Sequence, residues 1–271
     1  RKGIYLGATI QVIPHVTNEI KLFINSDLKN EDFIIYEIGG TVGDIESLPF
    51  LEAIRQIRND RKISSSLIHM TYVPFISSAS ELKTKPSQHS VKELLNAGIQ
   101  PDIIMCRCER NIDKEALKKI SLFCNVRKEN VIPALNASSI YEVPSLYYKA
   151  GLDKALLNEL GYNEKKYPLD LKPWKKVVNK YNNTSKEVKI SVVGKYTDLK
   201  DSYKSLNEAL IHGGLSNSTK VKINWLNAEK FNDKVIKQEL KNSDGILVPG
   251  GFGKRGIEGK ISSIKFARER N

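Results

Sequence analysis

The residues best suited to chemistry lie in one acidic, glycine-rich stretch, residues 37–47, which reads EIGGTVGDIES. It follows residues 33–36, a short apolar run of strand-forming side chains, so Glu37 is expected where a strand ends. In an open α/β sheet, ligands bind beyond the carboxyl ends of the strands. Glycines at such a turn let backbone N–H groups approach a phosphate, and carboxylates such as Asp44 and Glu46 can hold Mg²⁺ or a sugar hydroxyl. The stretch therefore predicts a nucleotide site. The plainer alternative is a tight turn with solvated acids.

A basic run at residues 83–90, KTKPSQHS, forms a second candidate site. It leads into the apolar positions of an expected helix, and Pro86 fits a first helical turn, where backbone N–H groups have no partner within the helix. Such N–H groups, with lysines and hydroxyls beside them, suit a polyphosphate. The side chains concerned are Lys83, Thr84, Lys85 and Ser87. A solvated basic helix start is the alternative interpretation.

Three further positions are weaker candidates. The run 248–253, VPGGFG, closes an expected strand, and its paired glycines could turn a backbone N–H toward a developing oxyanion. A plain turn explains that spacing equally well. Arg107 follows another apolar strand and Lys119 lies on an amphipathic helix, and each alone is more often a surface charge. The sequence contains no Walker A loop, and neither a nucleophile elbow nor a Cys–His pair follows Gly253.

Composition excludes several classes of protein. With 271 residues, 40% hydrophobic and 27% charged, the chain is expected to form two soluble globular domains. No apolar run approaches the roughly 20 residues of a membrane helix. The net charge of +12 could serve phosphates or RNA, but the lysines are scattered without interleaved aromatics, which favours solvated faces over a nucleic-acid site. Three cysteines without a framework pattern indicate reduced cytosolic thiols, and Cys106-x-Cys108 lies in a strand-like run typical of packing.

The pattern of elements predicts an α/β fold in two parts. Strands and helices alternate, which favours a mostly parallel sheet covered by helices. In the first part, strands are expected at 33–36, 67–75, 103–106 and 131–132, and helices at 48–58, 91–96 and 114–124, with Ser47 as the N-cap of the first helix. In the second part, strands are expected at 188–194, 221–226 and 245–248, and helices at 201–212 (ending at Gly213-Gly214), near 229–240 and from about 260.

Together these motifs resemble the CTP synthase family, the glutamine-dependent amidoligases of pyrimidine nucleotide synthesis. The resemblance runs from Tyr5 to Arg270 and is specific, because the matching segments are long and keep their order. The segments are residues 5–15 (YLGATIQVIPH), 37–56, 83–92, 98–102, 123–126 (FCNV), 193–196 (VGKY) and 247–256 (LVPGGFGKRG).

The resemblance implies a fold and an activity. The expected fold is a P-loop-type, parallel-sheet synthetase domain (residues 1–162), a linker (163–187) and a class I, flavodoxin-like glutamine amidotransferase domain (188–271). In the family, ATP phosphorylates O4 of UTP, and ammonia from glutamine displaces the phosphate from the 4-phosphoryl-UTP to give CTP. Mg²⁺ is the cofactor, GTP activates and CTP inhibits by feedback. A cytoplasmic homotetramer is expected.

Carried over by position, the resemblance implies roles for individual residues. Glu37 matches the Mg²⁺ ligand, and Arg107, Asn136 and Ala137 match the ATP side. Gly250, Gly251 and Phe252 match the glutamine pocket and oxyanion hole. The implied UTP and CTP contacts are Asp44, Ile45, Glu46, Lys83, Thr84, Lys85, Pro86, Ser87, Gln88 and Lys119. We expect the acidic turn and the basic run to converge on one uridine triphosphate and its magnesium.

The chain also departs from the family pattern. Ser80 stands where the family has glycine, and Asn136-Ala137-Ser138 replaces a common Asp-Val-Asp, which puts ATP affinity in question if the adenine contact uses that carboxylate. The family's phosphate loop is expected before Arg1, and its nucleophilic cysteine with a His–Glu pair after Asn271, so the chain by itself is expected to be inactive. The alternatives are a non-catalytic nucleotide-binding regulatory or scaffold subunit and, less favoured, an RNA-binding protein.

Overall fold

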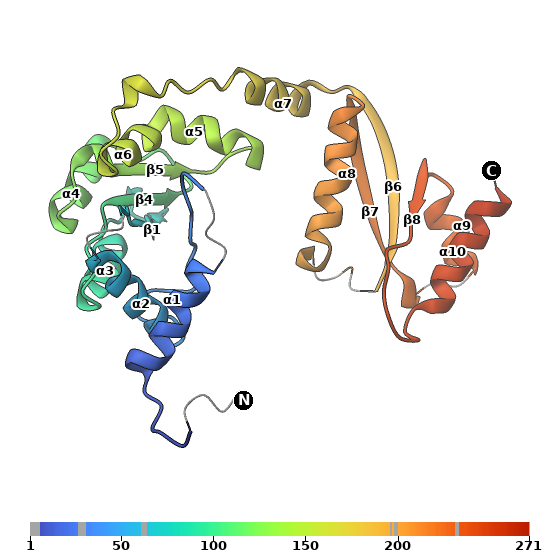
Figure 1. The fold of residues 1–271 in the computed structure, drawn as a ribbon. Coiled ribbons are helices and arrows are strands. Elements are labelled where there is room, and N and C mark those ends of the chain that lie inside the picture. Colours follow the sequence, from blue (N-terminus) through green and yellow to red (C-terminus); the bar gives the residue numbers. More distant parts are fainter. Residues whose placement is uncertain are drawn as a thin grey trace. The chain divides into compact units, whose positions relative to one another are not determined.

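The computed structural model describes residues 6–26, 31–60, 64–195, 197, 200–230 and 233–270. They form two compact units that divide between Leu169 and Asp170, within the predicted linker. Each unit contains its own parallel three-stranded sheet with helices packed on it, which confirms the α/β class (Figure 1). Within the described ranges, no helix combines the length and the apolar character that crossing a membrane would require.

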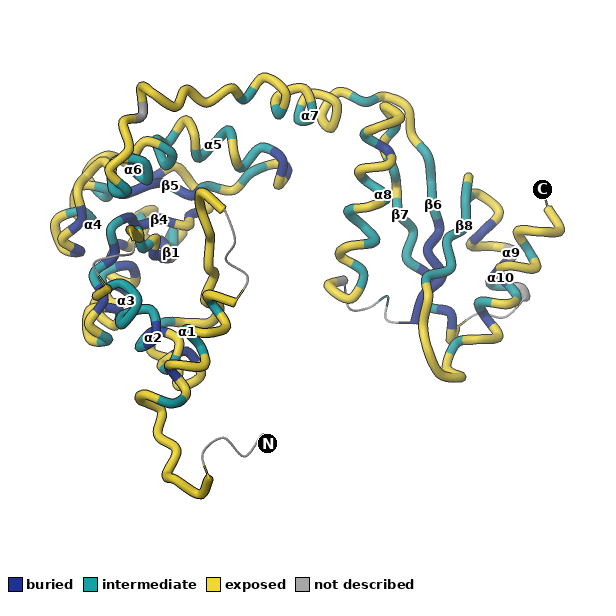
Figure 2. Tube along the Cα trace, viewed as in Figure 1, coloured by how far each residue is buried: buried dark blue, intermediate teal, exposed yellow. Residues whose placement is uncertain are grey.

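The sheet of the first unit has the order β1 (Ile68–Tyr72), β4 (Ile103–Cys108) and β5 (Val131–Leu135). The central strand β4 is buried on both faces: Ile104 and Cys106 point into one core, and Ile103 and Met105 into the other. A strand with two buried faces has a continuous apolar sequence, which is why this one was recognisable. Figure 2 shows burial concentrated along β4 and β5 in this unit.

Helices cover both faces of this sheet. The packing of α3 (Lys85–Asn96) and α4 (Lys114–Cys124) encloses one core, and that of α5 (Val143–Ala150) and α6 (Leu152–Glu159) encloses the other. Helix α2 (Leu48–Asn59) packs against α3 through Leu51 and Leu94. The remaining elements of the unit are η1 (Val12–Val16), α1 (Thr17–Asn25), β2 (Phe75–Ile76), β3 (Glu81–Leu82), η2 (Lys128–Asn130), η3 (Ile140–Glu142) and η4 (Glu164–Lys166).

The strand predicted at residues 33–36 is wrong. These residues pair with no strand among those described, and Ile35 is 93% exposed. Strand-forming side chains produce a strand only where a neighbour supplies partners for the backbone N–H and C=O groups. The segment is held instead by side chains: the Tyr36 hydroxyl donates to the Ile24 carbonyl at 2.6 Å, and the Phe33 ring packs against Tyr162.

The second unit is built on the order β7 (Thr219–Asn227), β6 (Lys186–Gly194) and β8 (Gly245–Leu247). Helices α9 (Asp233–Leu240) and α10 (Ile257–Glu269) pack on one face around Val193, and α8 (Lys204–Ser216) lies along β7 on the other (Figure 1). The unit also contains the short turns η5 (Lys200–Tyr203) and η6 (Ala228–Lys230) and the helix α7 (Lys172–Asn183), which occupies much of the predicted linker.

Candidate functional site

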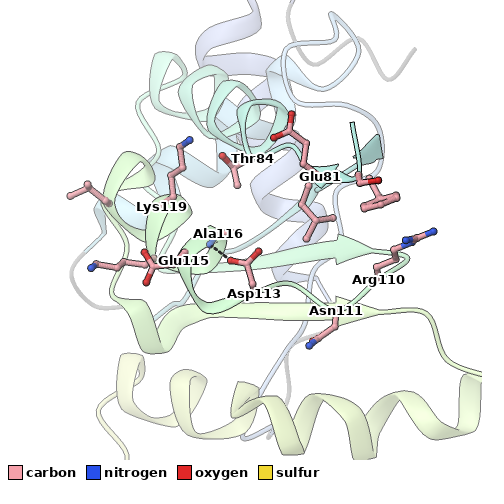
Figure 3. Close-up of a pocket in the computed structure, with 13 residues that line it drawn as sticks. Glu81, Thr84, Arg110, Asn111, Asp113, Glu115, Ala116 and Lys119 are labelled. Atoms are coloured by element: carbon pink, nitrogen blue, oxygen red, sulfur yellow. Dashed lines mark hydrogen bonds between the residues drawn. The ribbon is translucent and has the colours of Figure 1, made fainter. Parts of the chain in front are cut away.

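A cavity of about 690 Å³ in the first unit is lined by the β2–β3 hairpin, the start of α3, helix α4 and the segment 110–113 that follows the carboxyl end of β4 (Figure 3). Parallel α/β sheets bind ligands beyond the carboxyl ends of their strands. Both positive and negative side chains surround the cavity. The lining residues are Phe75, Ser80, Glu81, Leu82, Thr84, Arg110, Asn111, Asp113, Glu115, Ala116, Lys118, Lys119 and Leu122.

Two predicted nucleotide contacts, Thr84 and Lys119, meet in this cavity. Thr84 precedes α3 and is 6% exposed, and its hydroxyl accepts a hydrogen bond from the Gln88 side chain at 3.1 Å. Lys119 reaches the cavity from α4 (Figure 3). Because α3 and α4 pack on the same face of the sheet, Thr84 and Lys119 line one cavity although they are far apart in sequence. Such a pair suits a phosphate.

The start of α3 presents lysines and conceals a hydroxyl. Lys83 and Lys85 are exposed. Lys83 pairs with Glu81, and the Lys85 ammonium lies 5.7 Å from the centre of the Phe123 ring. Pro86 is also exposed, in the first helical turn as predicted. Ser87 is fully buried, and its hydroxyl donates to the Tyr72 carbonyl at 3.1 Å, which ties α3 to β1.

Residues beyond the sequence prediction also shape the cavity. The Arg110 guanidinium lies 3.7 Å from the centre of the Phe75 ring, and the two side chains together line part of the cavity. Asp113 caps α4 by accepting from the Ala116 N–H at 2.7 Å. Asp-x-x-Ala before an amphipathic run is a recognisable N-cap pattern, so Asp113 could have been identified from sequence. The pairing of Arg110 with Phe75 depends on the tertiary fold.

The acidic turn depends on glycines in the left-handed conformation, and its acidic residues are exposed. Gly40 and Gly43 have φ of +91° and +101°, a left-handed conformation that favours glycine. Ser47 precedes α2 as predicted, but its hydroxyl donates to the Asp44 carbonyl at 2.8 Å and makes no cap to a helix N–H. Val42 packs against the core shared by α2 and α3. The predicted ligands in this turn, Glu37, Asp44, Ile45 and Glu46, are all exposed.

None of residues 37–47 lines the cavity that contains Thr84 and Lys119. The described residues of one copy therefore do not bring the acidic turn and the basic run to a shared pocket. Val42 packs against the cluster of Leu51, Leu94 and Ile99, and Leu94 lies near the end of α3 opposite to Lys85. Their convergence on one ligand stays a prediction.

The predicted ATP-side residues share one edge of the sheet. In the parallel register of β4 and β5, Arg107 lies beside Ala134 and donates to its carbonyl at 3.1 Å. Asn136 directly follows the last residue of β5 and is exposed, and Ala137 is half-buried. Arg107 is thus fixed at the carboxyl edge from which residues 136–137 emerge.

The cysteines behave as packing residues. Cys106, Cys108 and Cys124 are free and buried together in the core under α3 and α4. Burial raises the pKa of Cys106 to about 12 and that of Cys124 to about 11, so both thiols stay protonated at neutral pH. Among the described side chains, no three of His, Cys, Asp or Glu gather in a way that could hold a metal ion.

In the second unit, the predicted oxyanion residues Gly250, Gly251 and Phe252 are exposed and follow β8. Lys195, at the end of β6, is 6% exposed and donates to the Phe252 carbonyl at 2.5 Å. No role is predicted for Lys195 from the sequence, although it lies in the matching segment 193–196. The sequence feature that could have identified Lys195 is its position directly after the strand β6.

Comparison with known proteins identifies the family to which the chain belongs. The family model described as CTP synthase N-terminus matches residues 1–162. The chain belongs to the CTP synthase family. A second family model, glutamine amidotransferase class-I, matches residues 198–271, so this member of the CTP synthase family combines the synthetase domain with an amidotransferase segment.

Relatives named CTP synthase match the whole chain. The protein from Paramagnetospirillum magneticum is 56% identical over 272 residues, and the one from Rhodospirillum rubrum is 58% identical over 274 residues. Each match covers 100% of this chain and 50% of the relative. The chain thus spans about half the length of the curated CTP synthases that it matches.

Proposed function

We propose that this chain is part of an enzyme that converts UTP to CTP with ATP and glutamine. Its relatives named CTP synthase match it along its full length, and that observation carries the proposal. The terminal phosphoryl group of ATP passes to O4 of UTP, giving 4-phosphoryl-UTP and ADP. Glutamine and water give glutamate and ammonia. Ammonia then forms the C4–N bond as phosphate leaves, and the product is CTP.

The cavity of the first unit supports a role in binding the nucleotide. Lys119 and Thr84 line it, and Lys85 stands exposed at the start of α3. The open N–H groups of that helix start and the nearby ammonium groups favour a triphosphate. We assign UTP, and CTP as feedback inhibitor, to this region. Asp44, Ile45 and Glu46 are assigned to the same ligand, either across a pair of copies in a homotetramer or after movement of the turn.

Glu37 suits a magnesium ion. It is exposed and, among the described residues, forms no salt bridge, and one carboxylate beside substrate phosphates is a common magnesium environment. When bound, Mg²⁺ would offset phosphate charge during transfer. Arg107, Asn136 and Ala137 are assigned to ATP. Exchanging Glu37 for Gln should raise the Mg²⁺ concentration needed for half-maximal rate. The matched change at Glu129, exposed on η2, should leave that concentration unaltered.

The second unit is assigned to ammonia release, with Gly250, Gly251 and Phe252 at the glutamine carboxamide. Cys106 and Cys124 are buried and protonated and do not suit the nucleophile, because the thiolate is the reactive form. Cys108 is buried in the same core. We assign the nucleophile to a residue outside this sequence. GTP is proposed as the activator of glutamine hydrolysis, and the cytoplasm as the location.

The test is an assay of the full-length natural protein that contains this sequence. With UTP, ATP, Mg²⁺ and GTP, it should form CTP from either glutamine or ammonium chloride. A folded protein that binds UTP but forms no CTP from either nitrogen source would refute the enzyme and favour the regulatory or scaffold subunit. Salt-sensitive binding of RNA without preference for UTP would favour the RNA-binding alternative.

A further inference from the structure

A buried lysine holds the glycine loop 249–253 from inside the second unit. The Lys195 ammonium donates to the carbonyl oxygens of Phe252 at 2.5 Å and Gly253 at 3.1 Å, and the residue is only 6% exposed. Its backbone N–H donates to the Tyr203 hydroxyl at 3.1 Å, so the end of β6 is itself fixed. A buried ammonium group requires such acceptors, because an unpaired buried charge is costly.

A second lysine holds the other end of the same loop. The ammonium of Lys260, on α10, donates to the Pro249 carbonyl at 2.8 Å. A Cβ placed on Gly251 would lie 3.5 Å from that ammonium nitrogen and 3.9 Å from Cε of Lys195. The two lysines therefore lie against the same side of the loop. Lys260 bonds to the carbonyl that precedes Gly250, and Lys195 bonds to the two carbonyls that follow Gly251.

These contacts determine which way the peptide groups face. In a trans peptide, the carbonyl and the N–H of the next residue point in opposite directions. The carbonyls of residues 249, 252 and 253 point to the lysines, so the N–H groups of Gly250, Gly253 and Lys254 point to the other side. The loop itself is exposed, so that outer side presents backbone donors to a ligand.

We propose that Lys195 and Lys260 are positioning residues for glutamine hydrolysis. They fix three peptide groups of the 249–253 loop, so that the N–H groups of Gly250, Gly253 and Lys254 are ready for the oxyanion formed when a nucleophile adds to the carboxamide carbon. Preorganised donors stabilise such charge because they need no reorientation during the reaction. The inference rests on the proposed function of the second unit. A flip of either the 252–253 or the 253–254 peptide would remove one of the two acceptors of the buried Lys195 ammonium, so the lysine opposes the unproductive conformation.

The experiment measures glutamine hydrolysis by the full-length protein with UTP, ATP, Mg²⁺ and GTP present. Lys195→Met removes the donors and keeps an apolar chain of similar length. The kcat should fall about 100-fold, the loss typical of one oxyanion donor, and the KM for glutamine should stay within about threefold. Lys195→Arg keeps a positively charged group with several N–H donors, enough for both carbonyls, and should recover most of the lost kcat.

Two further variants keep the test decisive if Lys195→Met does not fold. Lys260→Met, at a half-buried position, should lower kcat less and leave KM unchanged. Lys265→Met removes an exposed lysine of the same helix, paired with Glu269 at 3.9 Å, and should keep the wild-type kcat. CTP formation from ammonium chloride should be equal in all variants.

Two results would overturn the inference: a wild-type kcat in both Lys195→Met and Lys260→Met, or a loss of kcat matched by an equal rise in the KM for glutamine. The second would show that the lysines only maintain the shape of the pocket. Failure of the proposed function is a different result, in which the wild-type protein forms no CTP from either nitrogen source.

Discussion

Lysines in this chain differ in function according to their surroundings. Lys195 is buried and bonded to carbonyl groups, Lys119 lines the cavity of the first unit, and Lys83 is exposed and paired with Glu81. An exposed pair contributes little to stability, whereas a buried ammonium group must keep its acceptors. The +12 net charge thus combines residues of different function, and the charge alone identifies no partner.

Replacing Lys119 by alanine should weaken UTP binding. A cation paired with a phosphate contributes roughly 1.5–3 kcal/mol, so the KM for UTP should rise about 10- to 150-fold. Lys92→Ala, at an exposed position of α3, serves as the matched control and should leave that KM unchanged. The measurement is the steady-state rate of the full-length protein against UTP concentration. An unaltered KM in Lys119→Ala would remove Lys119 from the UTP site.

His69 should make the first unit sensitive to mild acid. It is 7% exposed, its Nε2 lies 2.8 Å from the Ser90 hydroxyl, and burial lowers its pKa below the usual 6.5. Above pH 6.5 the residue is neutral in the folded and unfolded states and its titration costs no stability. Below 6.5 the unfolded chain takes up the proton first, so stability falls until the lower folded pKa is reached.

The comparison is urea unfolding of wild type and His69→Asn, followed by circular dichroism between pH 7.5 and 5.5. Asparagine retains a hydrogen-bonding side chain but does not titrate in this range. We expect the wild type to lose more unfolding free energy on acidification than the variant. Equal losses of unfolding free energy in the wild type and in His69→Asn would show that His69 does not contribute to the acid sensitivity.

Among the elements, α8 shows how a glycine signal can mislead. The prediction ended this helix at Gly213-Gly214, but α8 continues to Ser216. A Cβ on Gly214 would lie 2.5 Å from the Thr219 carbonyl oxygen, so this glycine permits the helix to approach β7. Close packing and termination both select glycine, and only the position of the neighbouring strand distinguishes them.

Gly214→Ala should destabilise the second unit by about 1–3 kcal/mol, because a backbone atom blocks the added methyl group. Gly213→Ala is a matched control one residue away, where an added Cβ meets nothing within 4 Å. It should be neutral or stabilising by up to about 1 kcal/mol, since alanine favours helix more than glycine does. Denaturant unfolding followed by tryptophan fluorescence measures both. Equal midpoints for the two variants would contradict the proposed close contact.

At the scale of the whole molecule, each unit encloses its own core. The buried clusters around β1, β4 and β5 lie entirely within the first unit, and the cluster around Val193 lies within the second. Both tryptophans of the chain, Trp174 and Trp225, belong to the second unit. Tryptophan fluorescence therefore reports on the second unit, whereas circular dichroism reports on both.

Core substitutions should affect the units separately. Ile104→Ala empties a fully buried site of the first unit and should cost about 2–5 kcal/mol there, visible by circular dichroism but absent from the tryptophan transition. Leu240→Ala, in the core of the second unit, should shift the tryptophan transition. If Ile104→Ala moved the tryptophan midpoint as far as Leu240→Ala does, the two units would unfold as one.

The sequence alone determined the family, the α/β class and most elements of regular structure. The family was identifiable because the matching motifs are long and keep their order. Strand β4 and helix α4 were predictable because the pattern of apolar residues in each matches the pattern of burial. Tertiary structure decided what depends on neighbours. Residues 33–36 have strand-forming side chains but no partner among the described strands, and Ser87 has a phosphate-binding side chain type but donates to Tyr72. Lys195 acquires its role only because folding places the carbonyls of a distant loop beside it. Propensity is a property of a residue, whereas a partner for a hydrogen bond or a charge is a property of the fold.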